Sequence, residues 1–178
     1  MKKNTLSEIQ LFLTFAKEFI LLAVLSVLFF IGMSLFNHQN NPQIWAVILF
    51  VFSAGKVYLL ISNTFKKLDT LIKNNHKFNH TLLLLSIVIS LIIISFTLDY
   101  LCASEIYTNA FEGIQQEQKM IYRFTNLLYY SIVTFSGVGY GDITPKVAIS
   151  KLITVLEIIT SFVMIVFIIS KYSKKNKL

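Results

Sequence analysis

Long apolar runs, separated by short polar stretches, dominate the chain. Four runs are candidates for membrane crossing: residues 19–36, 44–62, 81–98 and 152–170. The first of them carries no charge, and as a helix it would extend about 27 Å, close to the thickness of the hydrocarbon core. The pattern therefore predicts four transmembrane helices.

Polar or amphipathic segments flank these runs. Residues 1–18 form a lead-in in which Ile9, Phe12, Leu13 and Ala16 recur at helical spacing, typical of a helix lying at the inner membrane interface. We interpret the first run as a retained helix that forms a hairpin with the second over residues 19–80, because no small-residue cleavage site follows it. Residues 171–178 form a basic tail, and we expect no soluble domain.

Composition supports a membrane protein. Hydrophobic residues make up 55% of the chain and charged residues only 14%, and the mean hydropathy is +0.67. A single cysteine excludes a disulfide within the chain, and no cluster typical of a metal site or a catalytic centre is visible. We therefore expect neither an enzyme nor a cofactor.

The chain has a net charge of +7. Its basic residues are distributed as expected for membrane topology, and this distribution argues against nucleic-acid binding. Lysines gather before the first run, between the second and third, and after the fourth. In contrast, residues 37–43 contain no Lys or Arg, and residues 99–123 contain four carboxylates against Lys119 and Arg123. This alternation predicts a multi-pass protein of the cell membrane with both termini in the cytoplasm.

One charge inside an apolar run has two possible environments. Lys56 lies in the second run. It could extend its ammonium group to the membrane surface, or pair with Glu18 at a comparable depth of the first run. Both interpretations are structural, and we assign Lys56 no role in transport.

Residues 134–142 read Thr-Phe-Ser-Gly-Val-Gly-Tyr-Gly-Asp and precede the last apolar run. An extended strand can replace the water around a cation if every backbone carbonyl points to one axis. Such a strand needs alternating backbone conformations that L-residues resist, which explains Gly139 and Gly141. Val138 and Tyr140 would then point away from the axis and brace the strand.

Val-Gly-Tyr-Gly-Asp in this setting resembles the selectivity filter of potassium channels, and the resemblance covers about residues 122–170. The chain resembles the two-helix pore module of bacterial potassium channels, preceded by two additional helices. The resemblance implies a pore domain over residues 81–170, made of an outer helix, a re-entrant pore helix over 120–135, a filter and an inner helix. One filter strand per chain implies a homotetramer, and the fold class is an all-α membrane protein with four transmembrane helices.

The resemblance also implies roles for individual residues. Filter residues would be Gly137, Val138, Gly139, Tyr140 and Gly141, with K⁺ bound by the carbonyls of the first four. Filter support would come from Tyr129, Tyr130, Asp142 and Glu157, an aromatic residue at the position of Tyr129 bonding the aspartate after the filter. Residues lining the cavity would be Ile158, Phe162, Ile165 and Ile169.

Glu157 is open to two interpretations. Its carboxylate could lie behind the filter, bonded to hydroxyl or amide groups of the pore helix. Alternatively, it could face the cavity, where four copies would concentrate cations. The cavity position falls on its neighbour Ile158, which favours the first interpretation.

One departure from the family pattern bears on selectivity. Gly137 stands where the family usually has a threonine whose hydroxyl and carbonyl form the innermost ion site. The filter motif as a whole still predicts a potassium-selective channel that conducts passively. Because of Gly137, the first alternative is a weakly selective monovalent cation channel. The second alternative is a non-conducting subunit that keeps the pore fold. No array of arginines is present to sense voltage.

Overall fold

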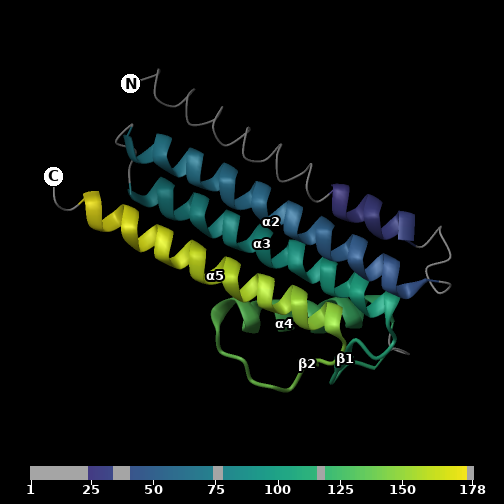
Figure 1. The fold of residues 1–178 in the computed structure, drawn as a ribbon. Coiled ribbons are helices and arrows are strands. Elements are labelled where there is room, and N and C mark those ends of the chain that lie inside the picture. Colours follow the sequence, from purple (N-terminus) through teal and green to yellow (C-terminus); the bar gives the residue numbers. More distant parts are fainter. Residues whose placement is uncertain (1–23, 34–40, 74–77, 116–118, 176–178) are drawn as a thin grey trace. The chain divides into compact units, whose positions relative to one another are not determined.

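The computed structural model describes residues 24–33, 41–73, 78–115 and 119–175 (Figure 1). The chain divides into two compact units, one of residues 1–37 and one of residues 38–178. In the first unit the described part is a short apolar helix, Val24–Met33. The remainder of the first predicted transmembrane run, like the amphipathic lead-in, lies outside the described residues.

Three long helices build the second unit: α2 (Pro42–Lys73), α3 (Phe78–Ile106) and α5 (Ala148–Lys175). They run side by side (Figure 1), and α3 contacts both of the others. Each contains a segment long and apolar enough to cross a membrane: Pro42–Lys66, Leu85–Ile106 and Ala148–Ser170. The prediction of an all-α membrane protein is confirmed.

Helix α3 is longer than the sequence pattern predicted. The hydropathy pattern predicts that the third run ends at residue 98 and that the acidic residues after it form a loop. The helix instead continues through Asp99 to Ile106, and Asp99 is buried. Hydropathy alone misplaced this boundary because the charge of Asp99 is neutralised by a contact from another helix.

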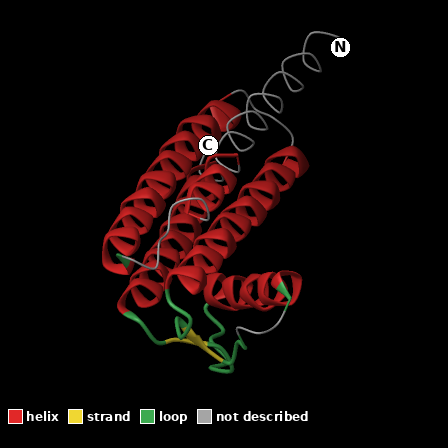
Figure 2. Cartoon of the chain, turned by 90° about the vertical axis from the view of Figure 1, so that its right-hand side faces the viewer, coloured by secondary structure: helices red, strands yellow, loops and turns green. Residues whose placement is uncertain are grey.

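A shorter helix, α4 (Met120–Ser136), lies crosswise to the three long helices at one end of the bundle (Figure 2). Two short strands, β1 (Phe111–Glu112) and β2 (Thr144–Pro145), flank it in the sequence and pair antiparallel. Because β1 and β2 are hydrogen-bonded neighbours, the segment between them leaves and returns at the same end of the bundle. Helix α4 and the loop after it are therefore re-entrant.

Buried side chains hold α4 against α3 and α5. Leu127 of α4 and Ile153 of α5 are 0% exposed, and Phe96 of α3 is 1% exposed. At the start of α4, the buried Arg123 donates to the Ser104 hydroxyl of α3 and forms an ion pair with Glu105. The apolar contacts and this charged anchor together fix the position of α4.

Candidate functional site: the filter loop and its support

The loop that leaves α4, residues 137–142, is named the filter loop here. Gly137 ends the helix in the left-handed conformation, with φ of 74°, and its N–H bonds the carbonyl of Thr134. The N–H of Val138 bonds the carbonyl of Val133 in turn. A left-handed glycine with these bonds is a common helix terminator, and it satisfies carbonyls that a helix end leaves open.

A further carbonyl at this helix end is satisfied from α5. The Ser161 hydroxyl donates to the Phe135 carbonyl at 2.5 Å, and Ser161 is buried. In the structure its hydroxyl joins α5 to the end of α4 immediately before the filter loop.

Two glycines of the filter loop have a backbone conformation that residues with side chains resist. Gly139 and Gly141 have positive φ, 58° and 79°. No atom lies within 4 Å of where a Cβ would be on either glycine. The preference for glycine is therefore conformational rather than steric. Val138 and Tyr140 are 54% and 70% exposed, so the loop has few side-chain contacts within the chain.

A buried polar cluster lies behind the filter loop, formed by Tyr100 of α3, Ser131 of α4 and Glu157 of α5. Glu157 is 0% exposed. One of its oxygens accepts a hydrogen bond from the Tyr100 hydroxyl and the other from the Ser131 hydroxyl, both at 2.5 Å. The carboxylate therefore joins α3, α4 and α5, and its bond to the Ser131 hydroxyl is a contact of the kind that the first of our two interpretations describes.

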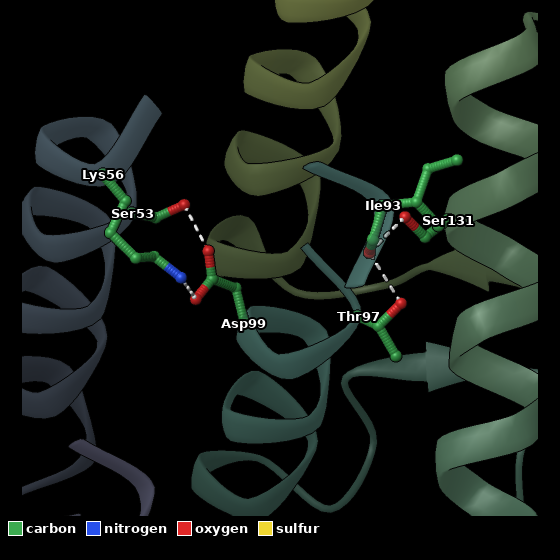
Figure 3. Close-up of polar contacts among 6 residues, drawn as sticks. All are labelled: Ser53, Lys56, Ile93, Thr97, Asp99 and Ser131. Carbon is green, nitrogen blue, oxygen red and sulfur yellow. Dashed lines mark hydrogen bonds and ion pairs between the residues drawn. The ribbon is translucent and has the colours of Figure 1, made fainter. Parts of the chain in front are cut away.

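Ser131 is also within hydrogen-bond distance of α3. Its hydroxyl lies 3.1 Å from the carbonyl of Ile93, which accepts a second hydrogen bond from Thr97 at 2.8 Å (Figure 3). Both Ser131 and Thr97 are fully buried. Besides the contacts of Arg123, the polar groups of α3 and α4 thus meet at the Ile93 carbonyl and at the Glu157 carboxylate.

The two tyrosines near the end of α4 have different environments. Tyr130 is buried, hydrogen-bonds Thr154 of α5 at 2.9 Å, and packs edge-on against Tyr100 and Phe111. It therefore packs into the core among the helices. Tyr129 is partly exposed, and its side chain lies near that of Asp142 at the end of the filter loop. Tyr129 thus brings α4 close to the far end of the loop.

The segment around the strand pair β1–β2 also contacts the far end of the filter loop, at Asp142. Gly113 follows β1 with φ of 85°, and a Cβ there would overlap the carbonyl oxygen of Asp142. Ala110, before β1, accepts hydrogen bonds from the Lys146 N–H and the Ser150 hydroxyl at 2.9 Å. The segment before α4 is thus in direct contact with the residue that ends the loop, which sequence reasoning missed.

The residues predicted to line a cavity share one property: each is exposed in the single chain. They are Ile158, Phe162, Ile165 and Ile169 of α5. They recur at helical spacing, so they form one apolar stripe on the helix. Glu157, the neighbour of Ile158, points to the other side of α5 and is buried.

The structure corrects our expectation for Lys56. Its ammonium group forms an ion pair with Asp99 of α3 at 2.5 Å, and both side chains are buried (Figure 3). The lysine does not extend to the membrane surface, and Glu18 lies outside the described residues. The sequence contained the signal, because Lys56 lies inside the second apolar run and the opposite charge of Asp99 directly follows the third, but the loop assignment of Asp99 concealed it.

Comparison with known proteins agrees with the geometry. A family model described as ion channel matches residues 82–176, more than half of the chain. The chain therefore belongs to the ion channel family. It is also similar to "Two-pore potassium channel 4" of Arabidopsis thaliana, with 28% identity over 113 residues. The match covers 64% of this chain but only 37% of that relative. No solved structure matches the chain.

Proposed function

We propose that the chain forms a potassium-selective channel that conducts K⁺ passively down its electrochemical gradient. The observation that carries the proposal is the filter loop, in which glycines of positive φ alternate with residues that bear side chains, at the end of a re-entrant helix. Membership of the ion channel family and similarity to a plant potassium channel support it.

In this proposal backbone carbonyls replace the hydration shell of the ion. The carbonyls of Gly137, Val138, Gly139 and Tyr140 are the ligands, and Gly141 ends the row. No resident cofactor takes part, because K⁺ is the transported ion. Tyr129 and Asp142 support the far end of the loop, Glu157 supports it indirectly by joining α5 to α3 and α4, and Tyr130 packs into the core among these helices.

One chain supplies one wall of a pore, so the proposal requires a homotetramer. The exposed stripe of Ile158, Phe162, Ile165 and Ile169 is then the lining of the central cavity. The exposed side chains of Val138 and Tyr140 would pack against neighbouring copies. Native mass spectrometry in detergent tests this point, because a stable dimer with no larger species is incompatible with the proposal.

The lysine distribution supports a definite orientation. Both termini face the cytoplasm of a cell membrane, and the lysine-rich end of α2 lies on the same side. The end of the bundle that carries β1, β2 and the filter loop then faces outward. Cysteine labelling from each side of a sealed vesicle, at introduced residues in the two kinds of loop, measures the orientation.

Gly137 favours a second candidate, a weakly selective monovalent cation channel. Without a threonine hydroxyl at this position, the innermost site has carbonyl ligands alone. A bi-ionic recording of the reconstituted protein, with K⁺ on one side and Na⁺ on the other, separates the candidates. A strongly shifted reversal potential supports potassium selectivity, a value near zero supports the second candidate, and the absence of current in assembled protein identifies a non-conducting subunit.

A further inference from the structure

Two adjacent residues of α3 make polar contacts with different helices. Asp99 accepts hydrogen bonds from Ser53 at 2.7 Å and from Lys56 at 2.5 Å, both on α2. Tyr100, the next residue, donates to Glu157 of α5, which also binds Ser131 of α4. Figure 3 shows Asp99 directed at α2 on one side of α3 and the Ile93 carbonyl directed at Ser131 on the other.

The contact of Asp99 with Ser53 and Lys56 is buried and polar. Ser53 is 0% exposed, Lys56 3% and Asp99 2%. A buried ion pair stabilises a fold weakly, because the loss of hydration offsets the attraction between the charges, and apolar side chains of similar size would often serve better. The distinctive property of this ion pair is that its hydrogen bonds are directional. Two donors at fixed distances from two carboxylate oxygens restrict sliding and rotation of α3 against α2, which an apolar contact does not.

We propose that Lys56 and Asp99 are positioning residues for ion conduction. The pair sets the axial and rotational position of α3, so that Tyr100 and the Ile93 carbonyl meet Glu157 and Ser131 behind the filter loop. The helix that precedes the pore module, α2, thereby controls the geometry of the pore helix without contacting the permeating ion. The inference rests on the proposed channel function.

The test removes the charges together, because removing one leaves a buried charge without its partner and damages folding for that reason alone. The double variant Lys56→Met/Asp99→Leu should assemble and still conduct. We expect its permeability ratio for K⁺ over Na⁺ to fall by roughly two- to thirtyfold, the range typical of mutations that alter coupling between sites. An assembled double variant with the wild-type ratio would overturn the proposal.

A milder variant provides a matched comparison. Ser53→Ala removes one hydrogen bond to Asp99 and should shift the permeability ratio in the same direction, by less. The control is Ser90→Ala on α3, whose hydroxyl binds the Ser86 carbonyl of its own helix. Ser90→Ala should leave the ratio unchanged. Equal ratios for Ser53→Ala and Ser90→Ala would contradict the proposal even if the double variant failed to assemble.

A measurement that needs no current separates this inference from the proposed function. The melting temperatures of Lys56→Met/Asp99→Leu, Ser131→Ala and their combination form a thermodynamic cycle. Lys56 lies on α2 and Ser131 on α4, and the contacts described for each go to different residues of α3 and α5, so independent sites would give additive effects. We expect non-additive effects, because α3 links the two contacts. Additive effects would overturn the positioning role whether or not the protein conducts.

Discussion

The filter loop and the polar cluster behind it depend on different parts of the chain. In the loop the geometry lies in the backbone, at Gly139 and Gly141, and the intervening side chains are exposed. In the cluster the geometry lies in side chains, with the buried Glu157 held by hydroxyls from two other helices. Damage to the loop should therefore abolish conduction while sparing stability, and damage to the cluster should lower stability first.

The largest effect is expected at Gly139. The variant Gly139→Ala should abolish K⁺ flux, because an L-residue at φ of 58° costs roughly 1–2 kcal/mol in every chain and the carbonyls would turn from the axis. Gly55→Ala in α2 is the control, since it has open space around it and no positive φ. Flux into vesicles is the measurement, with stability monitored in parallel. Selective flux through assembled Gly139→Ala would refute the filter assignment.

Substitutions at Glu157 test the contribution of the polar cluster to stability. Glu157→Leu leaves the Tyr100 hydroxyl without its carboxylate acceptor and leaves Ser131 only the Ile93 carbonyl at 3.1 Å, and an unsatisfied buried group costs about 1–3 kcal/mol. We expect a large fall in melting temperature, and a smaller fall for Glu157→Gln, which keeps one acceptor. Thr160→Val is the control on the same helix, because the Thr160 hydroxyl binds a carbonyl of its own helix. A melting temperature for Glu157→Leu equal to that of Thr160→Val would show that the cluster contributes nothing.

These two sites also differ in how far the sequence predicted them. The all-α fold follows from hydropathy, and the need for glycine in the filter loop follows from backbone conformation, so both can be predicted from local sequence. The partners of Glu157 and Lys56 cannot be predicted in this way, because they depend on the register between helices. Tyr100 and Asp99 were placed in a loop since a charge next to an apolar run normally marks its end, and only the packed structure shows that a lysine from α2 neutralises it.

Gly113 is where the segment before α4 touches the filter loop. Gly113→Ala would place a methyl group against the Asp142 carbonyl at a residue with φ of 85°, so the end of the loop must shift. We expect reduced K⁺ selectivity and a destabilisation of about 1–3 kcal/mol. The reversal potential under bi-ionic conditions reports the first effect and thermal unfolding the second. If selectivity is unchanged while stability falls, the strand pair supports the fold but not the filter.

Gly137 lies where α4, the helix that carries Ser131 of the polar cluster, passes into the filter loop. At φ of 74°, asparagine is tolerated but a β-branched residue is strained. Gly137→Asn should therefore change the free energy of unfolding by less than Gly137→Thr, with a difference of about 1 kcal/mol per chain. Equal melting temperatures would mean that the glycine conformation at this helix end contributes little to stability.

The smallest effect is expected at the ion pair between Glu112 of β1 and Lys146. The two charged groups lie 2.8 Å apart and are largely exposed. The hydrogen bond from Lys146 and its positive charge lower the pKa of Glu112 below its usual range. A carboxylate whose pKa is lowered by folding stabilises the folded state at neutral pH. That contribution is lost as the pH falls from the unfolded pKa of about 4.3 through the lower folded pKa.

Glu112→Gln should therefore lower the melting temperature slightly at pH 7 and not at all once Glu112 is protonated in acid. High salt should reduce the difference at pH 7, because exposed charges are screened. The measurement is thermal unfolding of wild type and Glu112→Gln at both pH values and two salt concentrations. The pair joins the strands beside the filter loop rather than the loop itself, so ion selectivity should be the same in both proteins. A selectivity change in Glu112→Gln would show that surface charge next to the strands reaches the filter, and the separation between loop and support would then be incomplete.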